Sequence, residues 1–132
     1  EMERKWLAGF SGRFSYSFQE VSSDQDGVEF ANFPKHLVKL NVFGPVIRNW
    51  LGAGMEIQYA SAQKNLDGTR DGGYTLVNAT LLSERIFRDL DLSFSVYNLF
   101  DKKYSNPGSR EHVQSDIEQD GRTFRLKATY RF

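Results

Sequence analysis

The sequence predicts an all-β fold: an antiparallel up-and-down meander of about six strands that forms part of a transmembrane β-barrel. Three observations support this prediction. Apolar and polar residues alternate with period two in several segments, long and short connections follow one another in turn, and the chain ends on an amphipathic strand with a terminal aromatic residue.

The last strand, residues 122–132, shows the alternation most clearly. Its even positions are apolar and its odd positions are polar or cationic: Phe124, Leu126, Ala128, Tyr130 and Phe132 against Thr123, Arg125, Lys127, Thr129 and Arg131. A strand with one apolar face, one cationic face and a final aromatic residue is typical of outer-membrane barrels, whose outer face meets lipid.

Five earlier strands are expected at 6–20, 35–43, 50–62, 73–83 and 90–98, none with a proline in its interior. The connections 21–34, 63–72 and 99–120 are long, and every Asp-Gly pair lies in one of them or closes it. The connections 44–49 and 84–89 are short. A meander therefore places all long loops at one end of the sheet, which is the asymmetry of outer-membrane barrels.

Composition excludes several classes of function. The chain has 17 cationic and 17 anionic side chains, which argues against a nucleic-acid partner. It has no cysteine and no apolar run long enough for a transmembrane helix. It contains no Gly-x-Ser-x-Gly, phosphate-loop or His-Glu-x-x-His motif. We expect no enzyme activity, no catalytic residue, no metal site and no cofactor.

Six strands are too few for a closed membrane barrel, because single-chain barrels start at about eight. An open sheet in lipid would leave backbone groups unpaired at both edges. We therefore expect residues 1–132 to be the C-terminal portion of a larger barrel.

The segment from Asn98 to Tyr104 carries a family resemblance. It reads Asn-Leu-Phe-Asp-Lys-Lys-Tyr and resembles a segment near the end of TonB-dependent outer-membrane receptors, with Asn98, Leu99, Phe100, Asp101 and Tyr104 as the motif residues. Residues 120–132 resemble the closing strand of that family, and 33–40 and 73–82 resemble two earlier strands.

The resemblance implies a 22-stranded barrel in the outer membrane of a Gram-negative bacterium. It also implies a plug domain and a TonB box, both outside this chain. Such receptors import a scarce nutrient with energy relayed by TonB, and an iron–siderophore complex is the leading substrate. The implied partners are outer-membrane lipid, TonB through the rest of the protein, the barrel-assembly machinery and a siderophore or similar small molecule.

Three groups of candidate site residues follow. The assembly signal comprises Phe124, Leu126, Tyr130 and Phe132, on an edge strand that can pair by strand addition. The lumen-facing set comprises Lys39, Glu56, Asp91, Arg125, Lys127 and Arg131, whose mixed charges favour a solvated wall over a substrate path. The last loop holds a possible extracellular ligand set, Arg110, Glu111 and His112, with Asp116, Glu118 and Asp120 nearby. Their spacing matches no ligand motif, so a solvated loop is favoured.

Aromatic residues are expected in interfacial girdles at both ends of the strands, with some as loop-packing residues. The set is Trp50, Phe43 and Phe132 near the short turns, and Phe18, Tyr59, Phe100 and Tyr104 near the long loops. Two other interpretations stay open: a small β-barrel that binds or adheres without TonB, and a soluble all-β domain whose aromatic residues form an internal core.

The assigned facing of the last strand makes a direct prediction. Replacing Leu126 or Phe124 with Arg places a cation against lipid, at a cost of about 2–4 kcal/mol at the membrane midplane. We expect Leu126→Arg to lower the yield of heat-modifiable barrel in the full-length protein, and Lys127→Gln to leave it nearly unchanged. Equal yields from the two variants would contradict the facing.

Overall fold

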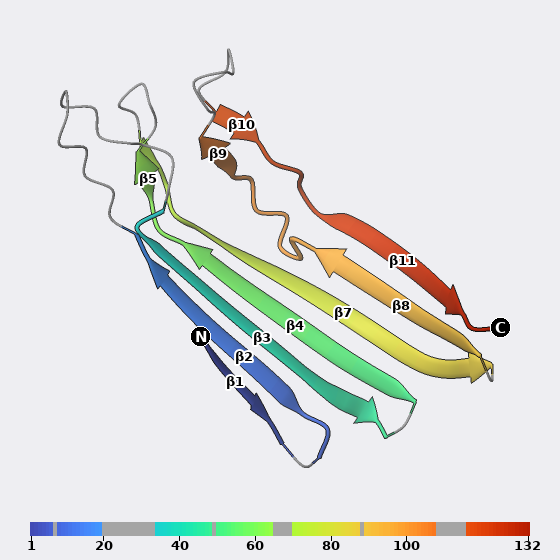
Figure 1. Ribbon diagram of the computed structural model, residues 1–132. Coiled ribbons are helices and arrows are strands. Elements are labelled where there is room, and N and C mark those ends of the chain that lie inside the picture. The colour runs from blue at the N-terminus through green and yellow to red at the C-terminus, as the bar shows by residue number, and fades with distance from the viewer. Residues whose placement is uncertain (7, 20–33, 49, 65–69, 88, 108–115) are drawn as a thin grey trace.

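The computed structural model describes residues 1–6, 8–19, 34–48, 50–64, 70–87, 89–107 and 116–132. One antiparallel sheet of seven strands runs in the order β1-β2-β3-β4-β7-β8-β11 (Figure 1). The strands are β1 Met2–Lys5, β2 Ser11–Phe18, β3 His36–Ile47, β4 Leu51–Ala60, β7 Tyr74–Phe87, β8 Leu90–Tyr97 and β11 Thr123–Tyr130. The predicted all-β meander is confirmed. The described residues form no helix, so none of them provides one long and apolar enough to cross a membrane.

Two short ribbons extend the long connections beyond this sheet. Strands β5 Gln63–Lys64 and β6 Arg70–Asp71 pair in the connection between β4 and β7. Strands β9 Ser105–Pro107 and β10 Asp116–Glu118 pair in the connection between β8 and β11. Both ribbons lie at the end opposite the short turns (Figure 1), so the predicted asymmetry of the connections is confirmed and the expectation of plain loops is wrong.

The first predicted strand, 6–20, is wrong in its N-terminal part. Here the chain turns: the Trp6 amide donates to the Phe10 carbonyl at 2.8 Å, and Gly9 has a φ of 83°. The preceding residues form β1, which pairs with β2 in full register. This seventh strand was missed because Met2–Lys5 has three charged residues and no apolar alternation.

Two strands are longer than predicted and pass through irregular pairing. Strand β3 continues through Pro45 to Ile47, with a register shift between these residues, and β7 continues to Phe87 with a shift after Ser83. The prediction that strands avoid proline is therefore wrong at Pro45 and at Pro107 in β9. A bulge and a short edge ribbon are the places where a missing backbone donor is tolerated.

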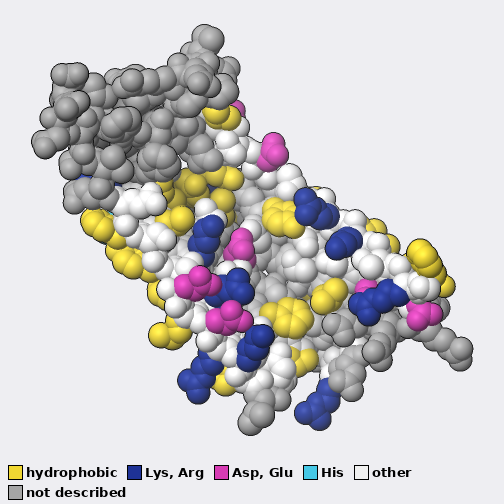
Figure 2. Space-filling view, viewed as in Figure 1, with side chains coloured by type: hydrophobic (Ala, Val, Ile, Leu, Met, Phe, Trp, Pro, Cys, Tyr) yellow, Lys and Arg dark blue, Asp and Glu magenta, His cyan; other side chains and the backbone are white. Residues whose placement is uncertain are grey.

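The register sorts the side chains into two faces, because partners in an antiparallel pair point the same way. The apolar face includes Phe14, Tyr16, Leu40, Val42, Met55, Ile57, Val77, Leu81, Phe94, Val96, Phe124 and Leu126. The polar face includes Arg13, Lys39, Asn41, Glu56, Asn78, Ser95, Arg125 and Lys127. Figure 2 shows the polar face, with charged side chains of both signs over its middle.

The described residues form no hydrophobic core. Among them only Ala60 and Tyr74 are buried hydrophobic residues, while Leu126 is 72% exposed and Met55, in a central strand, is 47% exposed. A soluble domain of this size buries its apolar surface between two packed layers. The interpretation as a soluble domain with an aromatic core is therefore wrong.

Aromatic rings cover glycines near the short-turn end. A Cβ atom on Gly44 would overlap the Phe10 ring, and one on Gly52 would lie 2.5 Å from the Phe43 ring. Each ring occupies the space that a glycine leaves on a neighbouring strand, which replaces the lost cross-strand packing. The aromatic turn residue Phe10 is thereby fixed against β3.

This packing predicts a site-specific cost. We expect Gly44→Ala to displace the Phe10 ring and to lower the free energy of unfolding of the full-length barrel by about 1–3 kcal/mol. A Cβ atom on Gly72 would have no heavy atom within 4 Å, so Gly72→Ala should change stability by less than about 0.5 kcal/mol. Denaturant titration in detergent micelles measures both, and equal costs would exclude the ring–glycine packing as the cause.

Candidate functional site

The motif residues 98–104 form a tight joint at the end of β8, which we call the joint. Strand β8 ends at Tyr97, so Asn98 belongs to the turn and not to the predicted strand. Asn98 and Asp101 have φ values of 52° and 54°, in the left-handed region. Asn and Asp tolerate this region better than other non-glycine residues, which explains their positions in the motif.

Asn98 holds the joint together with its side chain. It is 4% exposed. Its Oδ1 accepts from the Lys102 amide at 2.8 Å and its Nδ2 donates to the Lys102 carbonyl at 2.8 Å. Its backbone amide donates to Asn78 Oδ1 on β7 at 2.9 Å, and its carbonyl accepts from the Asp101 amide at 2.9 Å. One buried side chain therefore ties the turn to itself, and its backbone ties the turn to the adjacent strand.

Asp101 connects the joint to the last strand. Its Oδ1 accepts from the Arg122 amide at 2.8 Å, immediately before β11. A Cβ atom on Gly121 would lie 2.6 Å from the same oxygen, so a glycine is required for this approach. Asp101 thus closes the base of the connection 98–122, which is the last long connection of the chain.

Tyr104 packs at the same base. Its ring centroid lies 4.5 Å from that of Tyr74 at the start of β7, and its carbonyl accepts from the Gln119 amide at 3.0 Å. Burial raises the pKa of the Tyr104 phenol above its ordinary value, and the Asp120 carboxylate adds to the rise. Tyr104 therefore packs at the base of the loop, as was expected for some of the aromatic residues at the strand ends.

The remaining motif residues differ in exposure. The Leu99 amide donates to the Val77 carbonyl at 2.8 Å, which extends the pairing of β8 with β7. Phe100 is 74% exposed at the long-loop end. The motif was located in the sequence by resemblance. In the structure its residues fix the base of the connection 98–122.

A row of polar residues crosses the sheet on its polar face. Glu3, Arg13, Asn41, Glu56 and Asn78 are paired in register, one from each of five neighbouring strands. Arg13 lies 3.2 Å from Glu3, and Asn78 Nδ2 donates to Glu56 Oε1 at 2.8 Å. Of these five, only Glu56 was predicted from the sequence to face the lumen. Arg13, Asn41 and Asn78 lie on the polar side of the alternation in their own strands, which is the signal that could have found them.

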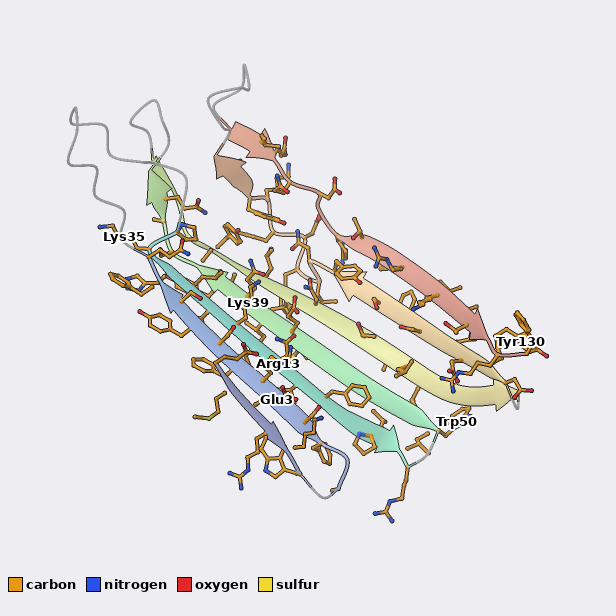
Figure 3. All side chains as sticks on the ribbon, in the orientation of Figure 1. Glu3, Arg13, Lys35, Lys39, Trp50 and Tyr130 are labelled. Atoms are coloured by element: carbon orange, nitrogen blue, oxygen red, sulfur yellow. The ribbon has the colours of Figure 1, made fainter. Side chains whose placement is uncertain are left out.

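These residues line a hollow of about 490 Å³ that we call the inner hollow. Phe43, Thr80 and Tyr97 are among its other lining residues. Figure 3 marks Glu3, Arg13 and Lys39 on this face of the sheet. Phe43 lies on the polar face, where it pairs with Gly54 and covers Gly52, so its predicted place in a lipid-facing girdle is wrong.

The six residues predicted to face the lumen share the polar face. The register pairs Lys39 with Gln58, Glu56 with Asn78, and Arg125 and Lys127 with serines of β8. Arg131 donates to Asp91 Oδ2 at 2.8 Å. Arg125 lies 5.4 Å over the Tyr97 ring, within the range of a cation–π contact. Among these six residues, Arg131 and Asp91 compensate one another's charge directly.

An aromatic group lies on the apolar face near the long loops. The Tyr16 hydroxyl lies 2.9 Å from His36 Nδ1, and the His36 ring is 5.2 Å from the Phe18 ring. Phe18 and Tyr59 are both about half exposed on this face. Rings of this kind at the strand ends suit a membrane interface. Trp50 lies in a short turn at the opposite end (Figure 3).

The structure provides no geometry for the possible ligand set in the last loop. Arg110, Glu111 and His112 lie outside the described residues. Across the part of the chain that is described, no group of three or more His, Asp or Glu residues is arranged to hold a metal ion. Phe124, Leu126 and Tyr130 lie on the apolar face of β11, an edge of the sheet, and Phe132 follows them in full exposure.

A single twisted sheet with one apolar face, one polar face and all long connections at one end is the wall of a membrane-spanning β-barrel. A family model described as TonB dependent receptor-like, beta-barrel, matches residues 1–99. The chain belongs to this family.

Among solved structures, the chain is similar to the closed form of the ferric-catecholate import receptor Fiu of Escherichia coli K12, with a TM-score of 0.76 and 24% sequence identity. The match covers 96% of this chain and 19% of that receptor, so the chain spans about a fifth of its length. The comparison with curated proteins returned no match. The likeness to Fiu shows the fold.

The joint predicts a graded response to substitution. We expect Asn98→Ala to lower the free energy of unfolding of the full-length barrel by about 2–3 kcal/mol, because it removes two buried hydrogen bonds and strains a left-handed backbone. Asn98→Gly removes the bonds without the strain and should cost about 1–2 kcal/mol. The exposed Lys103→Ala should cost less than about 0.5 kcal/mol. Denaturant titration measures all three, and equal costs for Asn98→Ala and Asn98→Gly would exclude the backbone strain.

Proposed function

We propose that this chain forms the C-terminal wall of a TonB-dependent receptor in the outer membrane of a Gram-negative bacterium, which imports a scarce nutrient with energy relayed by TonB. The family match over residues 1–99 is the observation that carries this proposal. The family consists of transporters, and the described residues offer no arrangement of catalytic groups, so the proposed activity is transport without chemistry on the substrate.

The two faces support a definite orientation. The apolar face with Leu40, Ile57 and Phe94 meets lipid, where alternate apolar residues satisfy the hydrocarbon region. The polar face with its inner hollow lines the lumen. The long connections then lie on the extracellular side, where their ribbons contribute to substrate capture, and the short turns lie in the periplasm.

A seven-stranded sheet cannot span a membrane alone, because β1 and β11 would each present an unpaired edge to lipid. The proposal therefore places the remaining strands, the plug and the TonB box in the rest of the receptor. It also assigns Phe124, Leu126, Tyr130 and Phe132 to recognition by the barrel-assembly machinery, since they are the exposed apolar residues on or beside the edge strand β11.

The proposed substrate is an iron–siderophore complex. The support is the fold likeness to Fiu, which is described as a ferric-catecholate import receptor. The polar wall is consistent with passage of a polar complex, since it carries charges of both signs, two pairs of which, Arg131 with Asp91 and Arg13 with Glu3, are in direct contact.

Uptake in cells tests this function. A strain that lacks its own catecholate receptors, and that expresses the full-length receptor, should accumulate radiolabelled iron supplied as a catecholate complex. Accumulation should stop when TonB is deleted, because transport needs the relayed energy. The control is the same strain with an empty vector.

Two outcomes would contradict the proposal. Accumulation that persists without TonB would exclude energy-coupled transport. Binding of the complex at the cell surface without any accumulation, with TonB present, would favour a binding or adhesion module.

A further inference from the structure

The joint is connected to the inner hollow by an unbroken chain of hydrogen bonds. Glu56 Oε1 accepts from Asn78 Nδ2 at 2.8 Å, and Asn78 Oδ1 accepts from the Asn98 amide at 2.9 Å. Asn98 then holds Lys102 through two bonds of 2.8 Å. The Asn98 carbonyl accepts from the Asp101 amide at 2.9 Å, and Asp101 Oδ1 accepts from the Arg122 amide at 2.8 Å. The chain runs from a carboxylate on the lumen wall to both sides of the last long connection.

We propose that Glu56, Asn78 and Asn98 act as a relay that couples the occupancy of the inner hollow by a cationic group to the stability of the turn 98–101 at the base of the last long connection. This inference rests on the proposed function, in which the polar face lines the lumen and the connection lies outside. Asn78 and Asn98 are positioning residues in this account, because they act on the loop through its backbone.

The acceptor oxygen of Glu56 favours one orientation of the Asn78 amide. A primary amide has a donor side and an acceptor side. With the donor side on the Glu56 carboxylate, the acceptor oxygen faces the Asn98 amide. The flipped amide would set its oxygen against the carboxylate and its donors against the Asn98 N–H. Both contacts would be unfavourable, so the carboxylate and the joint favour the same orientation.

A cation in the inner hollow would compete for this carboxylate. Glu56 lines the hollow, and Asn78 is its one hydrogen-bond partner among the described residues. A charge-assisted bond is roughly twice as strong as a neutral one, so an ammonium or guanidinium group would draw Glu56 away from Asn78. Asn78 would then be oriented by the Asn98 amide alone, and the bond from that amide to Asn78 Oδ1 would weaken.

Asn98 is suited to respond to this loss. It holds a left-handed φ of 52°, a conformation that persists because surrounding bonds determine it. When its bond to Asn78 weakens, the turn 98–101 is held less firmly, and the bond from Arg122 to Asp101 depends on that turn. The base of the connection loosens as a result. By reciprocity, a ligand that tightens the connection from outside would strengthen the hold on Glu56 and weaken the binding of a cation in the hollow.

Hydrogen exchange of single backbone amides tests the relay in the full-length receptor in detergent micelles, with mass spectrometry that resolves individual amides. We expect Glu56→Ala to raise the exchange rates of the Asn98 and Lys102 amides about fivefold, the effect of losing one hydrogen bond. Glu56→Gln keeps an acceptor oxygen and should leave both rates near those of the wild type.

Two matched controls separate the relay from general loosening. Thr80→Ala removes another hydrogen bond beside the hollow, the one to Ser95 at 2.9 Å, and should leave the Asn98 and Lys102 amides unchanged. The Leu99 amide is bonded to the Val77 carbonyl and not to the relay, so it should stay protected in Glu56→Ala.

A lysine side chain introduced beside Glu56 tests whether a cation in the inner hollow acts on the relay. Asn41 is opposite Glu56 in register, so Asn41→Lys places an ammonium beside the carboxylate. We expect the same rise in exchange at Asn98 and Lys102 as in Glu56→Ala, and no rise in Asn41→Gln.

Unchanged exchange at Asn98 and Lys102 in folded Glu56→Ala receptor would overturn the relay. An equal rise at Leu99, or the same rise in Thr80→Ala, would also overturn it. Unchanged exchange in Asn41→Lys would overturn the cationic input. None of these measurements needs TonB or substrate, so they can fail while uptake succeeds, and uptake can fail while they succeed.

Discussion

Backbone pairing in one continuous antiparallel register is the constraint on which the rest of this structure depends. In lipid every backbone donor and acceptor needs a partner within the protein, so the strands must pair along their whole length. Pairing at a given register also decides the face of every side chain. A slip of one residue in β11 would turn Arg125 and Lys127 toward lipid and Leu126 toward the lumen. The register shifts in β3 and β7 both lie near the short turns, away from the middle of the sheet.

Because of this register, side chains from neighbouring strands form a connected surface on the polar face. Because each strand contributes one residue to a row, side chains far apart in the sequence stand next to one another. Glu56 and Asn78 are 22 residues apart, and Asn78 and Asn98 are 20 apart, yet each pair is joined by a hydrogen bond. The long connection after β8 is therefore not an independent loop. Its base is bonded to Asn78, a residue of the polar face.

The meander and its two faces could be predicted from the sequence because period-two alternation is a local signal. The terminal strand and the placement of the six charged residues on one polar face both followed from it. Strand β1 was not predicted, because charged residues occupy Met2–Lys5 and only pairing with β2 defines the strand. Phe43 was misplaced for a related reason. The alternation in β3 places it with Lys39 and Asn41 on the polar face, whereas its contact with Gly52 depends on the pairing of β3 with β4.

The joint could be located but not explained from the sequence. The segment from Asn98 to Tyr104 was found by resemblance, whereas its physical basis is long-range. It needs a left-handed Asn98, a bond to Asn78 on another strand, and a glycine at 121 that admits Asp101. Each of these depends on the folded register of three strands. The side-chain pattern of a single segment does not predict such contacts.

The central claim, that one face of the sheet meets lipid and the other lines the lumen, is tested most directly along β4. Single nitroxide side chains at each position from Leu51 to Ala60, in the full-length receptor in a lipid bilayer, report contact with oxygen dissolved in the membrane. The account predicts high oxygen accessibility at the odd positions, which include Met55 and Ile57, and low accessibility at the even positions, which include Glu56 and Gln58. Accessibility without period two, or with the opposite phase, would contradict it.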